Sequence, residues 1–270
     1  MPCMTEDIHD LVVEKMLGFA CELSQSVAME VVARTGSTNA DLLARLPELS
    51  MPTLLVAEQQ TAGRGRAGRS WLSAPGCSLT FSLAWPFAQN PQALLGLPLA
   101  IGVALAQALA TLDVPVQLKW PNDVLKDGKK LAGILIETAT HGKTTWAVIG
   151  IGINLRMPDE LEQQIGHAVA DMPWLAQMDR NQLIAILLTQ LSETLQQFSE
   201  RGFAEFISEW NRFHAYAGQA VWIFDQGKVV QQGIARGVNE MGCLLLEDRY
   251  GISMVMAGDV SLRAVNNQDI

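Results

Sequence analysis

The sequence predicts an α+β protein, with a mixed sheet and flanking helices followed by a small SH3-like β-barrel. Over residues 1–217, apolar strand patterns are interspersed with segments of helical periodicity. After Gly218 the helical pattern stops, and short strand patterns follow one another at close spacing. We therefore expect a larger domain over 1–217 and a β-barrel domain over 218–270.

The first half of the chain alternates between the two kinds of periodicity. The expected elements are a helix over 5–26, a strand over 29–34, a helix over 38–46, a strand over 53–60, a loop over 61–76 and a strand over 78–85. Thr38 and Asp41 stand in capping-box spacing at the start of the second helix. The loop is rich in glycine and contains three arginines, which sets it apart from its neighbours.

The stretch Ala93 to Leu112 carries no charge and is long enough to span a bilayer. Pro98 and glycines interrupt it, many of its positions are only alanine, and no basic residue flanks it closely. We therefore expect a buried helix of a globular protein rather than a membrane span.

The later elements follow the same logic. They are a strand over 116–120, a hairpin over 124–138 with a polar turn at 127–130, a strand over 145–155, two helices over 180–213, and barrel strands over 220–225, 228–236, 242–248 and 251–256. Trp210 and Phe213 fall on the helical periodicity and are expected in the core.

Composition excludes several classes of protein. With 49% hydrophobic and 17% charged residues over 270 positions, the chain is globular and large enough for a sizeable core. A net charge of −9 makes it a poor general nucleic-acid binder. The four cysteines form no C-x-x-C pair, and the acidic start resembles no signal peptide, so we expect a cytoplasmic protein.

The loop Gly63-Arg-Gly-Arg-Ala-Gly-Arg-Ser70 matches G-x-G-x-x-G and nearly matches a P-loop. Both motifs require a helix directly after the glycines, whereas Pro75-Gly76 and a strand follow here, so we reject both. Glycines still let backbone amides approach an anion, and arginines supply fixed charge for phosphate or carboxylate. The alternative is a solvated basic loop that touches RNA.

Two further segments carry polar groups at strand ends. Lys119-Trp-Pro-Asn-Asp123 is a proline-containing turn, and taken alone it reads as an ordinary hairpin connection. Lys129 reads as an exposed turn lysine, while Lys130 enters a glycine-containing strand from which it could reach a phosphate. Gly150 and Gly152 leave one face of a strand bare, which suits either close packing or a flat ligand.

Five motifs together resemble biotin–protein ligases in content and order. They are Ser37-Thr-Asn39, Glu58-Gln-Gln-Thr-Ala-Gly-Arg-Gly-Arg66, Lys119-Trp-Pro-Asn-Asp123, Lys130-Leu-Ala-Gly-Ile134 and Gly150-Ile-Gly-Ile-Asn154. The resemblance covers about residues 30 to 155 strongly and the barrel by pattern only. It implies the class II synthetase-like catalytic fold of that family. The type implied is the monofunctional one that lacks an N-terminal DNA-binding domain, because only one good helix precedes Ser37.

The resemblance also implies site residues. Those implied for biotin are Ser37, Thr38, Asn39, Gln60, Arg64, Gly65, Arg66, Lys130, Gly133 and Gly150, with Gly152 in the same slot. Those implied for ATP are Arg64, Arg66, Arg69, Trp71, Asn122, Lys130 and Asn154. Catalytic roles fall to Arg66 and Lys130 by electrostatic stabilisation, and to Asp123 as a candidate for orienting or deprotonating the acceptor amine.

The activity implied has two half-reactions: ATP and Mg²⁺ convert biotin to biotinyl-5'-AMP, and a lysine of a biotin carboxyl carrier protein then takes the biotin. The loop over 61–76 would shield the mixed anhydride from water. A homodimer is possible, and neither DNA nor a membrane is expected as a partner. Two alternatives stay open: a lipoyl or octanoyl ligase or transferase of the same fold, and a non-catalytic biotin-binding regulatory module.

Overall fold

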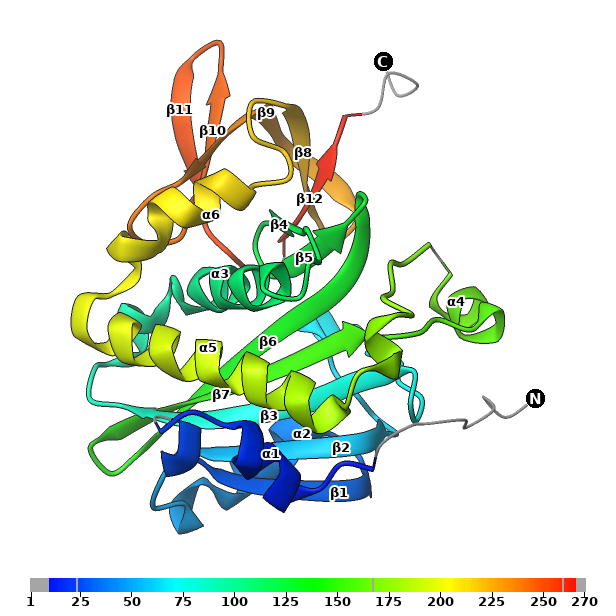
Figure 1. Cartoon of the computed structure of the whole chain (residues 1–270). Helices are drawn as coiled ribbons and strands as arrows, with labels where there is room; N and C mark the ends of the chain where they lie inside the picture. The colour runs from blue at the N-terminus through cyan, green and yellow to red at the C-terminus, as the bar shows by residue number, and fades with distance from the viewer. Residues whose placement is uncertain (1–9, 23, 167, 259, 266–270) are drawn as a thin grey trace.

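The computed structural model describes residues 10–22, 24–166, 168–258 and 260–265. Two sheets organise these residues (Figure 1). The larger sheet has the order β1-β2-β3-β7-β6-β5-β4. Its strands are β1 (Ala28–Thr35), β2 (Thr53–Gln60), β3 (Ser78–Phe87), β4 (Gln117–Lys119), β5 (Asp123–Lys126), β6 (Lys129–His141) and β7 (Thr144–Asn154). Only β1 and β2 pair in parallel, so the sheet is mixed, as predicted.

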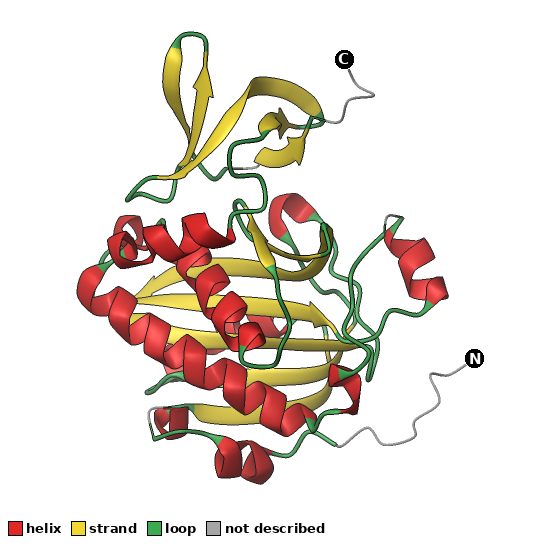
Figure 2. Ribbon diagram, turned by 45° about the horizontal axis from the view of Figure 1, so that its top comes forward, coloured by secondary structure: helices red, strands yellow, loops and turns green. Residues whose placement is uncertain are grey.

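Helices cover both faces of the larger sheet. The helices are α1 (Val13–Phe19), α2 (Thr38–Arg45), α3 (Leu97–Ala110), α4 (Asp159–Ile165), α5 (Arg180–Arg201) and α6 (Ile207–Phe213). Long helix α5 packs against α3 and α1 on one face (Figure 2). Alternate residues on the other face pack against α2, among them Leu55, Ala84 and Val148. Period-two alternation in the strands therefore supplies two cores with one sheet between them.

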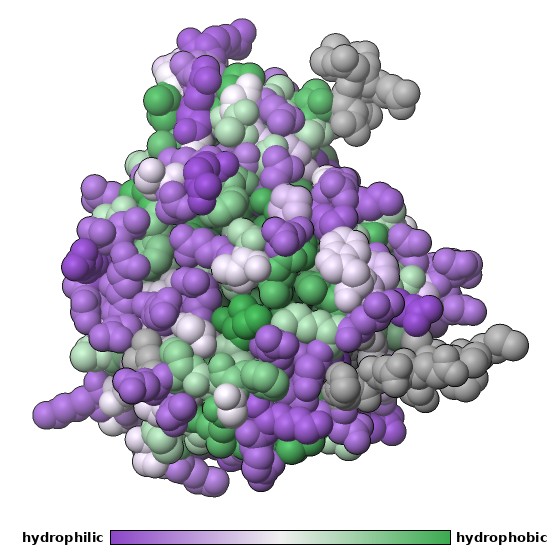
Figure 3. All heavy atoms as spheres, viewed as in Figure 1, coloured by the Kyte–Doolittle hydropathy of each residue, from purple (hydrophilic) through white to green (hydrophobic). Residues whose placement is uncertain are grey.

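The uncharged stretch forms the centre of the protein. By length and composition alone, the segment Pro91–Ala110 could cross a membrane. However, 72% of an apolar 18-residue stretch within it is buried inside the protein. Leu97, Ile101 and Leu105 within it are fully covered. The prediction of a buried helix is confirmed, and hydrophilic residues spread over much of the face that Figure 3 shows.

The prediction of a helix over 5–26 is wrong in its extent. Residues 5–9 lie outside the described residues, and beyond them only Val13–Phe19 is α-helical. The Val12 N–H donates to Asn181 Oδ1 at 2.7 Å and holds Val12 extended. Ser24 Oγ lies 3.2 Å from Thr189 Oγ1. A tertiary hydrogen bond to α5 therefore takes the Val12 backbone N–H, and a side-chain contact of Ser24 joins the following segment to the same helix.

The helix predicted over 38–46 is capped by Ser37, one residue before Thr38, which the capping-box spacing indicated as the cap. Ser37 is the N-cap and accepts from the Ala40 N–H at 3.5 Å. Asp41 instead accepts a hydrogen bond from the hydroxyl of Thr35. This shift frees the Thr38 side chain to point away from the helix end.

The C-terminal residues form a five-stranded antiparallel sheet of order β11-β10-β9-β8-β12. Its strands are β8 (Ala220–Asp225), β9 (Lys228–Val238), β10 (Leu244–Asp248), β11 (Gly251–Val255) and β12 (Val260–Ala264). The four predicted strands are confirmed. Strand β12 and helix α4 have short, weakly patterned sequences and were not predicted. The Trp120 Nε1–H donates to the Gly242 carbonyl at 3.1 Å and joins this sheet to the larger one.

Candidate functional site

A cavity of about 1000 Å³ opens on the face of the larger sheet that carries α2. Every site residue predicted from the sequence lines this cavity. They are Ser37, Thr38, Asn39, Gln60, Arg64, Gly65, Arg66, Arg69, Trp71, Asn122, Asp123, Lys130, Gly133, Gly150 and Asn154. Predicted residues up to 117 positions apart (residues 37 and 154) therefore meet in one place, because β2, β3, β7 and β6 are neighbours in the sheet.

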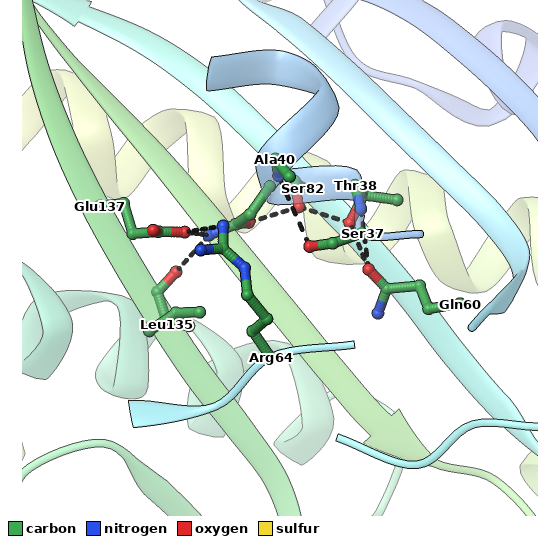
Figure 4. A network of polar contacts seen from close by, with 9 residues as sticks. Ser37, Thr38, Ala40, Gln60, Arg64, Ser82, Leu135 and Glu137 are labelled. Carbon is green, nitrogen blue, oxygen red and sulfur yellow. Dashed lines mark hydrogen bonds and ion pairs between the residues drawn. The ribbon is translucent and has the colours of Figure 1, made fainter. Parts of the chain in front are cut away.

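One end of the cavity contains a continuous chain of polar side chains (Figure 4). The Thr38 and Ser82 hydroxyl oxygens lie 2.6 Å apart, and the Ser82 hydroxyl donates to Asn39 Oδ1 at 2.6 Å. Asn39 Nδ2 donates to Glu137 Oε2 at 2.9 Å, and Arg64 Nη2 donates to the same oxygen at 2.8 Å. We call these five residues the polar chain.

Gln60 continues this end of the cavity with a defined orientation. Its Oε1 accepts the Thr38 backbone N–H at 2.8 Å. A backbone N–H can only donate, so the amide oxygen must face Thr38 and Nε2 remains as a donor. The Ser37 hydroxyl, whose oxygen accepts at the helix cap, likewise retains a proton to donate.

Three glycines leave room for specific side chains. A Cβ on Gly150 would lie 2.9 Å from Asn39 Cγ, and one on Gly152 would lie 2.7 Å from Trp71 Nε1. At Gly133 the nearest atoms are Lys130 Cε and Nζ, at 3.1 Å. The close-packing interpretation of the Gly150–Gly152 pair therefore describes this structure. Trp71 Nε1 is buried against Gly152 and makes no hydrogen bond among the described residues.

The other end of the cavity is cationic. Lys130 Nζ lies 2.5 Å from Asp123 Oδ1. Burial is the main cause that lowers the pKa of Lys119, the Asp123 charge opposes it, and the positive charges of Lys130, Arg263 and Arg69 lower it further. Four cations thus gather around one carboxylate, a field suited to a polyanion.

Two asparagines brace this end. Arg66 Nη1 donates to Asn122 Oδ1 at 3.0 Å, and Arg66 Nη2 donates to the Gly258 carbonyl. Asn122 Nδ2 in turn donates to the Ile134 carbonyl at 2.8 Å. Asn154 Nδ2 donates to the Ala170 carbonyl at 3.1 Å, so its oxygen is the group left for other partners.

The arginine loop over 61–76 has a hairpin-like backbone. The Trp71 N–H donates to the Gly63 carbonyl at 2.9 Å and the Gly65 N–H to the Arg69 carbonyl at 2.7 Å. No α-helix follows the glycines, which agrees with the rejection of the phosphate-loop and dinucleotide motifs. Lys129 is exposed, as predicted.

Sequence reasoning missed four cavity or network residues: Ser82, Glu137, Tyr216 and Arg263. Ser82 and Glu137 looked like ordinary alternation within strands. Arg263 lies on β12, a strand that the sequence pattern did not predict. Burial and the nearby Asp123 raise the pKa of Tyr216, but its sequence context gives no signal.

Comparison with known proteins places these features in context. Residues 31–154 match the model of the biotin/lipoate A/B protein ligase family. The chain is 38% identical over 236 residues to the bifunctional ligase/repressor BirA of Escherichia coli, covering 84% of this chain and 72% of that protein. It is 36% identical to the biotin–[acetyl-CoA-carboxylase] ligase of Mycobacterium tuberculosis, covering 86% and 88%. Biotin protein ligase from Aquifex aeolicus in complex with biotin and ATP superposes with a TM-score of 0.73 at 32% identity, covering 88% of this chain and 99% of that one.

Proposed function

This chain belongs to the biotin/lipoate A/B protein ligase family, and we propose that it is an ATP-dependent biotin–protein ligase. It activates biotin to biotinyl-5'-AMP and transfers the biotin to a lysine of a carrier protein of acetyl-CoA carboxylase or a related carboxylase. The observation that carries this proposal is the cavity with two unlike ends, a neutral hydrogen-bonding end and a cationic end.

The neutral end suits a ureido ring. Such a ring has two N–H donors and one carbonyl acceptor. Gln60 Nε2 and the Ser37 hydroxyl provide donors for the carbonyl, and the hydroxyl oxygen of Thr38 provides an acceptor for an N–H. Asn39 is assigned to the same ring through the polar chain, and Gly65, Gly133 and Gly150 line the slot.

The cationic end suits ATP. A carboxylate oxygen of biotin attacks the α-phosphorus, the bond to the bridging oxygen breaks, and pyrophosphate leaves. Charge accumulates on the phosphates, which Lys130 and Arg66 stabilise with Arg69 beside them. Trp71 flanks the nucleotide, and Asn122 and Asn154 hold the loops that surround it.

The second half-reaction consumes the mixed anhydride. A neutral lysine amine attacks the biotinyl carbonyl, the bond to the phosphate oxygen breaks, and AMP leaves. Asp123, which lies against Lys130, is placed to orient that amine or accept its proton. Arg64 and Arg66 keep the arginine loop closed over the anhydride and exclude water.

Mg²⁺ enters this proposal with ATP. Among the described residues there is no group of three or more histidine, cysteine, aspartate or glutamate side chains that could hold a metal. Asp123 is the one carboxylate among the described residues that line the cavity. These residues therefore suit an ion carried by the phosphates rather than one held in a protein cage.

The polar end also discriminates between the alternatives. A lipoyl or octanoyl group has no hydrogen-bonding ring, so Gln60 Nε2 and Asn39 would be desolvated without compensation. A non-catalytic biotin-binding module would not require the cations at the other end. We further propose a catalytic domain over 1–217 and a barrel domain over 218–270, a cytoplasmic location and a possible homodimer without DNA binding.

The test is biotin-dependent release of pyrophosphate from ATP, with octanoate and lipoate in parallel. Release of pyrophosphate with biotin, but not with octanoate or lipoate, supports the ligase and the interpretation of the polar end. Release with octanoate or lipoate alone would favour the lipoyl alternative. Biotin binding without any release would favour the regulatory module.

A further inference from the structure

Glu137 accepts hydrogen bonds at one carboxylate oxygen from both sides of the cavity rim. Asn39, on α2, donates from one side at 2.9 Å, and Arg64, on the arginine loop, donates from the other at 2.8 Å. Glu137 itself stands on β6, does not line the cavity and belongs to none of the five motifs. This carboxylate therefore links two separate elements of the site, α2 and the arginine loop.

The acceptor oxygen of Glu137 determines how Asn39 is oriented. A carboxylate only accepts, so the NH₂ group of Asn39 must face it, and the Leu135 carbonyl at 3.3 Å accepts from the same group. Asn39 Oδ1 must then face Ser82. Gly150 keeps this orientation possible, because a Cβ there would collide with the Asn39 amide.

The orientation of Asn39 in turn fixes two hydroxyl protons. Ser82 has a single proton and donates it to Asn39 Oδ1 at 2.6 Å. The 2.6 Å contact between Ser82 and Thr38 therefore needs the proton of Thr38, because two oxygens at that separation repel without one. Thr38 Oγ1 also lies 3.1 Å from Gln60 Oε1, but that contact is the longer of the two, and the Gln60 oxygen already accepts the Thr38 backbone N–H. All the hydrogen bonds thus run from Thr38 toward Glu137, and Thr38, Asn39 and Ser82 are almost fully buried.

The consequence reaches the cavity. With its proton directed inward, Thr38 Oγ1 offers only lone pairs to a ligand, while Gln60 Nε2 offers a donor. We infer that Glu137 is a positioning residue. It sets the pattern of hydrogen-bond donors and acceptors that binds a ureido ring, and it anchors the arginine loop through Arg64. This inference rests on the proposed function for its substrate, and it adds a residue that acts without touching that substrate.

Two substitutions separate the two roles. Glu137→Ala removes the acceptor for both Asn39 and Arg64. Glu137→Gln keeps an amide oxygen that can accept from Asn39 but removes the charge opposite Arg64. Glu247→Ala and Glu247→Gln are matched controls, because Glu247 pairs with Arg236 on the C-terminal sheet and its side chain is 42% exposed.

The first readout is biotin binding by calorimetry, which needs no turnover. Glu137→Ala should weaken biotin binding by about tenfold or more, while ATP binding changes less than about threefold. Dethiobiotin, which keeps the ureido ring, should lose affinity by the same factor. Glu137→Gln should restore biotin affinity to within about threefold of the wild type, which a merely structural defect would not predict.

The second readout is trypsin cleavage in the arginine loop of the ligand-free protein, where Arg64, Arg66 and Arg69 are the sites. Cleavage should be several-fold faster in both Glu137 variants than in the Glu247 controls, because neither keeps a charged partner for Arg64. Biotin affinity and cleavage that both match the Glu247 controls would overturn the inference.

The proposed function can fail separately. A wild-type protein that binds biotin but releases no pyrophosphate would not be a ligase, while the Glu137 variants would still decide whether this residue orders the polar chain. A wild-type protein that binds no biotin would overturn both the proposed function and the inference that the polar chain binds a ureido ring.

Discussion

The Asn39 side chain packs directly against Gly150 and occupies the space that a larger residue there would need: a Cβ on Gly150 would lie 2.9 Å from Asn39 Cγ. Asn39 cannot retreat, because its amide makes hydrogen bonds to Ser82, Leu135 and Glu137. The bare face of β7 at this point is therefore occupied by a protein side chain that is itself part of the cavity wall.

Gly150→Ala should accordingly disturb the ring-binding end. We expect a loss of about 1–3 kcal/mol of stability from overpacking, together with biotin binding weakened by at least about tenfold as Asn39 is displaced. Urea unfolding and calorimetry would measure the two effects. Gly18→Ala is the control, because nothing lies within 4 Å of a Cβ there. Equal behaviour of the two variants would contradict this role of Gly150.

Lys130→Gln should slow adenylation far more than Lys129→Gln. Both lysines line the cavity, but Lys130 lies beside Asp123, whereas Lys129, the first residue of β6, is exposed. Removing one preorganised positive group from the developing charge should lower the rate of pyrophosphate release by about 10²–10³-fold. Single-turnover kinetics with saturating biotin and ATP would measure it. Similar rates in the two variants would remove Lys130 from the proposed mechanism.

Arg66→Ala should allow biotinyl-5'-AMP to leak or to form poorly while biotin still binds measurably. The guanidinium ties the arginine loop to Asn122 and to the Gly258 carbonyl, so its loss opens the cover over the anhydride. Retention of adenylate after rapid gel filtration would measure the leak. Arg249→Ala, an exposed arginine on the turn between β10 and β11, is the control. Unchanged formation and retention in Arg66→Ala would refute the role given to this loop.

His214 should make the protein less stable in mild acid. Its side chain is buried against Trp210, both ring nitrogens make no hydrogen bond among the described residues, and burial lowers its pKa from 6.5 to about 4. Above pH 6.5 both states are neutral and stability is complete. Below pH 6.5 His214 is protonated in the unfolded state but stays neutral in the folded state. The free energy of unfolding therefore falls with pH until the pKa of His214 in the folded state is reached.

The expected loss from His214 is about 2 kcal/mol between about pH 7.5 and pH 5, from a pKa difference of roughly 2.5 units. The free energy of unfolding in urea would be compared at both pH values for the wild type and His214→Phe, which keeps an aromatic ring without a titrating group. A pH dependence that is the same in both proteins would show that His214 is not its source.

The sequence by itself was sufficient for the α+β class, for the strands other than β12, and for the motif residues that line the cavity. Strand periodicity is local, and motifs such as Ser37-Thr-Asn39 and Lys130-Leu-Ala-Gly-Ile134 carry the types of side chain that their chemistry needs. The buried helix α3 was equally readable, because its composition leaves few other environments open.

Tertiary structure alone decided how those residues act together. The polar chain joins α2, β3, β6 and the arginine loop, and no local pattern marks Ser82 or Glu137 as members. Arg263 reaches the cationic end only because β12 pairs with β8 beside the cavity. The N-terminal helix was overpredicted for the same reason, since Asn181 on α5 takes the Val12 N–H that periodicity assigned to a helix. Hydrogen-bond partners distant in sequence are chosen by packing, and packing is a property of the whole fold.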